Sequence, residues 1–283
     1  MHWRIKGVAA ACALLVAGLG TGCTTESSAD SRPADSPSGS GAASSSAAPS
    51  ANPRAAVEAA YRKWGLKPLA EAPEPPATKP VQLKSGGQIP VISEIPTKEK
   101  IVFLTFDDGT EQDPEFITMM RELKLPITMF LTNAAIKNDY GYFTKLQSLG
   151  NPVENHTLTH PNLPTLGAAA QQEEICGQQT KLKDHYGTAP RLFRPPYGNW
   201  NEATRTAAAS CGLQAIVLWR ESMQIKNMQY QLPGKKLRPG DIILAHFRGP
   251  SELKGRTITQ MTVNMLRHIE EQGFTVARLE DYL

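Results

Sequence analysis

Two adjacent aspartates, Asp107 and Asp108, follow an apolar run at residues 101–106 and precede a glycine. Neighbouring residues of a strand point to opposite faces, so both carboxylates can serve one site only where the strand ends and the chain turns. Two carboxylates this close stay ionised together beside a cation. The pair therefore predicts a metal site in which one aspartate binds the ion and the other accepts a proton. The alternative is an Asp-Gly turn that caps the following helix.

Two histidines further along the chain, His156 and His160, supply candidate metal ligands. Their imidazoles can face one point if the segment between them forms a single helical turn. Two imidazoles and one carboxylate suit zinc in an open catalytic site, or another divalent transition ion such as Co²⁺. Alone, this spacing also fits two surface histidines, so the prediction depends on their meeting Asp108.

Two further polar groups follow predicted strands. Arg194 precedes a stiff diproline, so its guanidinium could hold Asp107 ionised while a rigid backbone N–H beyond it binds an oxyanion. The alternative is an ordinary proline-rich loop. His246 ends a buried apolar run, and in a site that already has a base it is the candidate acid for a leaving group. A lone histidine there also fits a structural role.

The elements that must position these residues alternate between apolar strands and helical patterns. This β-then-α order predicts an α/β fold with about seven parallel strands, closed or nearly closed into a distorted (β/α) barrel that is irregular at residues 220–239. Each polar cluster follows the end of a predicted strand, so loops at one mouth would gather them all. The predicted strands are 101–106, 127–131, 152–155, 191–194, 213–219, 241–246 and 274–278, and the predicted helices are 113–123, 140–149, 168–185, 202–210 and 258–272.

The N-terminal third has a different composition. Residues 1–22 combine basic residues, an apolar run and small residues, which predicts a secretory signal peptide. Its end resembles a bacterial lipoprotein cleavage box, so Cys23 is the candidate lipidation site, with simple secretion as the alternative. We expect a flexible, disordered Ser/Ala/Pro tether at 23–53, a short helix and Pro-rich strap at 54–96, and the catalytic domain at 97–283. The expected location is extracytoplasmic, either lipid-anchored to the outer face of a bacterial membrane or secreted.

Charge and cysteine content restrict the partners. The formal net charge is +3, and it falls to +1 once Arg4 and Lys6 leave with the signal peptide. A nearly neutral body gives no support for nucleic-acid binding, and membrane contact would come only through the lipid. We expect a monomer. Cys176 and Cys211 fall on predicted helices of neighbouring βα units, where they either form a disulfide or remain two buried free thiols.

Taken together, four motifs resemble those of the NodB-homology polysaccharide deacetylases, carbohydrate esterase family four, over residues 97–283. The motifs are T-F-D-D-G at 105–109, N-H-T-L-T-H at 155–160, F-R-P-P-Y-G at 193–198 and I-I-L-A-H at 242–246. The resemblance implies a distorted (β/α) barrel with one divalent metal ion, usually zinc, that hydrolyses N-acetyl groups on amino-sugar polymers, or sometimes O-acetyl groups. It assigns the general base to Asp107, the metal ligands to Asp108, His156 and His160, the partner of the base to Arg194, the oxyanion donor to the Tyr197 backbone N–H and the general acid to His246.

The chain departs from the family pattern at three places. The family often has an aspartate after the fifth strand that orients the acid histidine, and here residues 218–224 read L-W-R-E-S-M-Q, with Glu221 as a candidate substitute. Phe247 stands where an acidic or amide residue commonly follows the histidine, and Glu154 replaces a usual small residue. These changes leave the metal ligands intact and affect the surroundings of His246 and the substrate groove.

These observations predict a metal-dependent hydrolase that removes N-acetyl groups from peptidoglycan or a chitin-like polymer. One alternative is an O-acetyl esterase acting on xylan-type polysaccharide, because an ester leaving group needs less help from an acid. The other is a surface glycan-binding module that has lost turnover through changes after the fifth strand.

Overall fold

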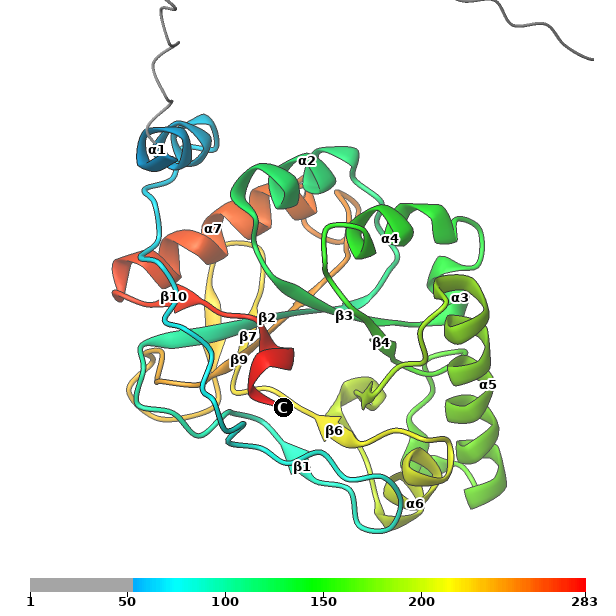
Figure 1. Ribbon diagram of the computed structural model, residues 1–283. Coiled ribbons are helices and arrows are strands. Elements are labelled where there is room, and N and C mark those ends of the chain that lie inside the picture. Colours follow the sequence, from blue (N-terminus) through cyan, green and yellow to red (C-terminus); the bar gives the residue numbers. More distant parts are fainter. Residues whose placement is uncertain (1–52) are drawn as a thin grey trace, which may run out of the picture. The chain divides into compact units, whose positions relative to one another are not determined.

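The computed structural model describes residues 53–283 (Figure 1). The predicted signal peptide, the lipidation candidate Cys23 and the predicted tether up to residue 52 lie outside the described residues. The described part begins with helix α1 (Pro53–Lys63). Within residues 53–283, no helix combines the length and the apolar character needed to cross a membrane.

One curled, mostly parallel sheet lies at the centre of this part of the chain (Figure 1). Its strand order is β1-β6-β5-β4-β3-β2-β9-β7-β8, and β10 pairs with β2. The seven strands expected from the sequence are β2 to β6, β9 and β10, so the prediction of a distorted parallel α/β barrel is confirmed. The strands are β1 (Val91–Ile92), β2 (Ile101–Asp108), β3 (Ile127–Leu131), β4 (Val153–Asn155), β5 (Leu192–Phe193), β6 (Ala215–Val217), β7 (Glu221–Met223), β8 (Met228–Tyr230), β9 (Ile242–His246) and β10 (Thr275–Val276).

Successive side chains of β2 point to opposite faces of the sheet, and each face packs against a different part of the core. Leu104 and Phe106 point towards the helices, where the Phe106 and Phe116 rings lie 5.3 Å apart. Phe103 points to the other face and packs edge-on against Tyr282 at 5.1 Å. Both faces of β2 are therefore buried, as expected of a central parallel strand. The helices that flank the sheet are α2 (Pro114–Leu123), α3 (Asn133–Ile136), α4 (Tyr140–Gln147), α5 (Ala168–Tyr186), α6 (Glu202–Ser210) and α7 (Ile258–Glu271).

Two features differ from the expectation. The segment 220–239, expected to be irregular, contains an antiparallel pair formed by β7 and β8, with β7 running parallel to β9. Residues of the strap form β1, which pairs with β6, and an isolated bridge joins Glu94 to Asp241. The strap is therefore a part of the sheet, because it covers the edge of β6 that would otherwise be unpaired.

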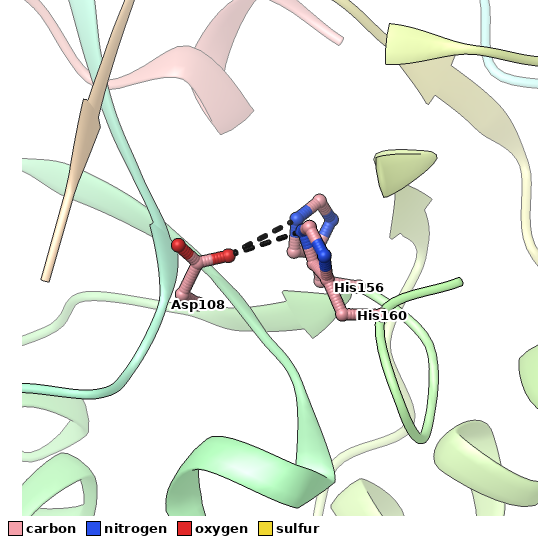
Figure 2. A group of neighbouring side chains, drawn as sticks. All are labelled: Asp108, His156 and His160. Atoms are coloured by element: carbon pink, nitrogen blue, oxygen red, sulfur yellow. Dashed lines mark ion pairs between the residues drawn. The ribbon is translucent and has the colours of Figure 1, made fainter. Parts of the chain in front are cut away.

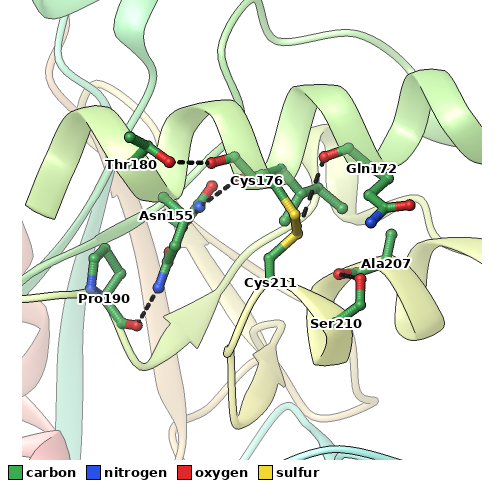
Figure 3. Close-up of a disulfide and its surroundings, with 10 residues drawn as sticks. Asn155, Gln172, Cys176, Thr180, Pro190, Ala207, Ser210 and Cys211 are labelled. Atoms are coloured by element: carbon green, nitrogen blue, oxygen red, sulfur yellow. Dashed lines mark hydrogen bonds between the residues drawn. A yellow bond between two sulfur atoms is a disulfide. The ribbon is translucent and has the colours of Figure 1, made fainter.

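The cysteine pair is bridged. Cys176 in the middle of α5 and Cys211 at the end of α6 form a disulfide with a Cα–Cα distance of 5.0 Å (Figure 3). Of the two alternatives left open by the sequence, the structure has the disulfide. It ties together the two helices that follow β4 and β5.

Candidate active site

Asp107 and Asp108 both belong to β2, because the strand extends two residues beyond its predicted end. Asp107 continues the regular strand pairing and lies opposite His246 on β9. Asp108 has a left-handed φ of 75°, which rotates its side chain out of the strict alternation. The next residue must be glycine, because at Gly109 (φ 104°) a Cβ would lie 2.4 Å from Cγ2 of Ile136. The sharp turn thus occurs at the strand end, as the sequence predicts.

Asp108, His156 and His160 come together at this end of the sheet (Figure 2). Oδ1 of Asp108 lies 3.6 Å from Nε2 of His156 and 3.3 Å from Nε2 of His160. The expected helical turn between the histidines is wrong, because the segment is a loop. Left-handed conformations at Thr157 (φ 72°) and His160 (φ 62°) bring the imidazoles together instead.

The donor set fits a divalent metal ion. Oδ1 of Asp108 is buried, and none of the described residues forms a hydrogen bond with it, which is costly for a carboxylate unless a cation binds there. Nδ1 of His156 lies 2.6 Å from the carbonyl of Arg194, so this ring can donate there and leave Nε2 as the ligand atom. Two imidazoles and one carboxylate match zinc or a related transition ion.

The electrostatics of the three residues are strongly coupled. Burial acts to raise the pKa of Asp108, but the neighbouring imidazoles, His156 foremost, outweigh it and hold that pKa well below its ordinary value. Burial acts to lower the pKa of His156, and the charges of Asp107 and Asp108 reverse this, so its pKa is raised. His160 has a lowered pKa, because burial and the charge of His156 dominate. Asp108 therefore stays ionised, the form that binds a cation.

Arg194 reaches Asp107 as the sequence predicts. Its Nη1 donates to Oδ1 of Asp107 at 2.6 Å and to Oγ1 of Thr105 at 2.8 Å, and the whole side chain is buried. Nε donates to the carbonyl of Val217 at 2.9 Å, and the guanidinium lies 4.2 Å from the centre of the Phe130 ring. These contacts fix the orientation of Asp107 through Oδ1, while its Oδ2 faces the site and lies 3.7 Å from Nε2 of His156.

His246 and Tyr197 border the same centre. His246 is the ladder partner of Asp107, and burial lowers its pKa to about 4 against the opposing charges of the two aspartates. No hydrogen bond from a described residue orients its ring. Tyr197 has a left-handed φ of 62°, its side chain is exposed, and its ring lies 4.8 Å from that of His160. All seven predicted catalytic and metal-binding residues thus lie at one end of the sheet.

Glu221 and Glu154 lie away from His246. Glu221 is buried and feels the charge of Asp241, at the opposite end of β9 from His246, and so does not take the place of an orienting acid. Glu154 accepts hydrogen bonds from the backbone N–H groups of Arg191 and Leu192 at 2.7 and 2.6 Å. Glu154, which departs from the family pattern, therefore links β4 to the start of β5.

Sequence reasoning missed Arg248. Its Nη2 lies 3.7 Å from Oδ2 of Asp108, on the segment that follows β9. The only available indication was its position two residues after His246. It joins the site as a cation beside the predicted metal ligands.

Comparison with known proteins places the chain in a family. The profile described as polysaccharide deacetylase matches residues 94–216. An uncharacterized protein of Streptomyces coelicolor is 42% identical over 195 residues, which cover 69% of this chain and 77% of that protein. The chain belongs to the polysaccharide deacetylase family. The resemblance seen in the sequence to carbohydrate esterase family four is thereby confirmed.

More distant members of this polysaccharide deacetylase family have named activities. A chitooligosaccharide deacetylase of Sinorhizobium fredii is 27% identical, with 63% of this chain and 89% of that protein aligned. A peptidoglycan-N-acetylglucosamine deacetylase of Bacillus cereus is 26% identical, with 67% of this chain and 91% of that protein aligned. A family 4 carbohydrate esterase from Bacillus anthracis has the same fold, with a TM-score of 0.56, 22% identity and coverage of 68% of this chain and 86% of that one.

Proposed function

We propose that this polysaccharide deacetylase family member is a metal-dependent hydrolase that removes N-acetyl groups from an extracytoplasmic amino-sugar polymer, either peptidoglycan or a chitin-like polymer. The observation that carries the proposal is the convergence of Asp108, His156 and His160 beside an aspartate held by Arg194. The names of the relatives from Sinorhizobium fredii and Bacillus cereus support this class of substrate.

In the proposed reaction, Asp108, His156 and His160 hold one divalent ion, with zinc preferred for this donor set. When bound, the ion supplies Lewis-acid chemistry to the acetamide carbonyl and the attacking water. Asp107 accepts the proton of that water at Oδ2, because the hydrogen bond from Arg194 to Oδ1 holds the carboxylate in a fixed orientation.

The remaining residues act on the oxygen and nitrogen of the amide. The backbone N–H of Tyr197 donates to the oxyanion of the tetrahedral intermediate. His246 protonates the departing sugar nitrogen, so the C–N bond breaks, acetate leaves and a free amine remains on the sugar. Asp107, the ladder partner of His246 on the adjacent strand, is the proposed source of that proton once it has accepted one from the water.

The proposal extends to location and assembly. A signal peptide at 1–22 followed by lipidation of Cys23, or by secretion, would place the enzyme outside the cytoplasm, where the polymer is. A monomer meets the requirements of the proposed site, because all seven residues come from one chain.

One observation favours a second candidate, an O-acetyl esterase acting on xylan-type polysaccharide. His246 has a lowered pKa and no orienting hydrogen bond from the described residues, so it is a weakly supported acid. An alkoxide leaving group needs less protonation than an amine. Release of acetate from acetylated xylan but not from amino-sugar polymers would favour this candidate.

An acetate-release assay over a panel of acetylated glycans, with and without chelator, tests the proposal. We expect release from peptidoglycan or chitin oligomers, loss of release after chelation, and recovery with added zinc. Glycan binding without any release by the zinc-loaded protein, unchanged by Asp107→Asn, would support a binding module instead.

Two matched substitutions separate the roles of the adjacent acids. We expect Asp107→Asn to lower kcat about a thousandfold, because the proton acceptor is lost, while the zinc content stays near one ion per chain. Asp108→Asn should lower both kcat and zinc content, because a charged ligand is lost. Zinc content measured by elemental analysis distinguishes them, and equal zinc loss in both variants would contradict the assignment.

A further inference from the structure

Arg248 lies at the edge of the proposed metal site. It comes two residues after His246, and its Nη2 is 3.7 Å from Oδ2 of Asp108. Its side chain is 39% exposed, so the guanidinium is accessible from outside while reaching the site. This cation is not among the residues that the proposed reaction uses.

The guanidinium of Arg248 makes only two long ionic contacts, with Asp108 at 3.7 Å and with Glu252 at 3.5 Å. A guanidinium has five N–H donors, and none of them forms a hydrogen bond with a described residue. Nε is buried and lacks a hydrogen bond, because its ion-pair partner, Oε1 of Glu252, lies 3.5 Å away without hydrogen-bond geometry. A buried donor left in this way costs free energy that a suitable acceptor would recover.

The backbone around Arg248 is fixed in position. Its N–H donates to the carbonyl of His246 at 2.9 Å, and the N–H of Glu111 donates to the carbonyl of Phe247 at 3.0 Å. The following residue is held closely, because a Cβ at Gly249 would lie 1.8 Å from Oε2 of Glu111. The guanidinium is thus presented from an ordered segment, which favours specific binding.

A second exposed group borders the proposed metal ligands. The ring of Tyr197 is 62% exposed and packs against His160, as Arg248 packs near Asp108. An aromatic face suits a sugar ring, and a guanidinium suits a planar oxyanion through two parallel hydrogen bonds. The surroundings of the site therefore match a sugar that carries an acidic substituent.

We propose that Arg248 is a specificity-determining residue that binds a carboxylate on the substrate, so that the enzyme prefers a carboxylate-bearing amino-sugar polymer over a neutral one. The lactyl carboxylate of N-acetylmuramic acid has this chemistry, and chitin lacks it. This inference rests on the proposed deacetylase function and narrows its substrate class.

Three oligosaccharides of equal length test the inference with the zinc-loaded full chain. One alternates N-acetylglucosamine and N-acetylmuramic acid with free carboxylates, the second has these carboxyls converted to methylamides, and the third is a chitin oligomer. We expect kcat/KM for acetate release to be about tenfold higher for the carboxylate form, mainly through a lower KM. Arg248→Gln should abolish this ratio, and Arg248→Lys should retain part of it.

Substitution of Glu252 should change the substrate preference in the opposite direction. Glu252→Gln removes a competing carboxylate near the guanidinium, so it should increase the preference for the acidic substrate. Calorimetric binding of the first two oligosaccharides to the Asp107→Asn protein, with and without Arg248→Gln, gives a second readout that does not depend on turnover.

The outcomes separate the two proposals. Equal kcat/KM for the carboxylate and amide forms, or an equal loss on both in Arg248→Gln, would overturn the role of Arg248 in specificity and leave it as a neighbour of Asp108. If no oligosaccharide releases acetate, the proposed function fails, and the calorimetric comparison still decides whether Arg248 binds the carboxylate.

Discussion

Asp107 and Asp108 are adjacent residues of one type, yet they have different surroundings. Arg194 donates to Oδ1 of Asp107 at 2.6 Å, whereas Oδ1 of Asp108 faces two imidazoles. The left-handed φ of 75° at Asp108 is the cause, because it turns the second carboxylate towards the same site as the first. Two carboxylates in different environments can then serve as base and ligand.

A buried acid pair away from the site predicts a pH dependence of stability. Glu221 and Asp241 are both buried, and burial together with the charge of Asp241 raises the pKa of Glu221. The folded protein thus keeps a proton that the unfolded chain releases above about pH 4.3. The proton kept by Glu221 therefore stabilises the folded protein. This stabilisation is fully present below that pH, and it falls as pH rises, by up to about 1.4 kcal/mol per pH unit.

Urea unfolding of the wild type and Glu221→Gln between pH 5 and 8 checks this expectation. The amide has nearly the same size as the carboxyl group but does not titrate, so the variant should lose less stability over this range. Glu202→Gln, at an exposed position on α6, should follow the wild type. Parallel pH profiles for the wild type and Glu221→Gln would show that Glu221 does not keep its proton in the folded protein.

At the residue scale, the convergence of the candidate site residues could be predicted and their local backbone could not. Strand ends that meet at one edge of a parallel sheet suffice to bring Asp108, His156 and His160 together. The left-handed conformation at Thr157 is unfavourable locally and is imposed by contacts such as its N–H donating to Oδ1 of Asn155 at 3.0 Å. Arg248 was missed because a lone arginine after a strand has no distinguishing pattern.

At the scale of elements, the disulfide links α5 to the end of α6. Cys176 and Cys211 are separated by 35 residues, and closing a loop of this length in the unfolded chain is worth about 4 kcal/mol. The double variant Cys176→Ala/Cys211→Ala should therefore lower the free energy of urea unfolding by about this amount. Activity should persist under conditions where the variant is folded, because neither cysteine contacts the seven site residues.

Reductant supplies the control for that prediction. It should lower the stability of the wild type to near that of the double variant and leave the variant unchanged. A variant as stable as the oxidised wild type would show that the bridge does not contribute to stability.

Long, strongly patterned elements could be predicted and short ones could not. The β2 strand and helix α7 have continuous apolar or amphipathic patterns that identify them. The β7 and β8 strands have three residues each and mixed polarity, and β1 has only two residues. Their pairing depends on neighbouring strands distant in the sequence, which local patterns do not contain.

At the scale of the whole described molecule, the strap holds together parts of the sheet that are far apart in sequence. The N–H of Val81 donates to the carbonyl of Tyr282 at 3.3 Å, and the N–H of Lys84 donates to that of Gln214 at 3.3 Å. Further along, the N–H of Ile95 donates to the carbonyl of Gly240 at 2.8 Å. The strap thus connects the β6 edge with the start of β9.

Substitution of Gly240 tests how much the contacts of the strap contribute to the free energy of unfolding. A Cβ at Gly240 (φ 84°) would lie 1.9 Å from the carbonyl oxygen of Ile95, so Gly240→Ala must displace the strap. Gly212 (φ 86°) is the matched control, because a Cβ there meets no atom within 4 Å. Both alanines cost about 1 to 2 kcal/mol for the left-handed backbone, and only Gly240→Ala also weakens the hydrogen bond of Ile95, for a total of about 3 kcal/mol. Urea unfolding measures both variants, and equal losses would mean that the strap adapts without cost and contributes little to holding the sheet closed.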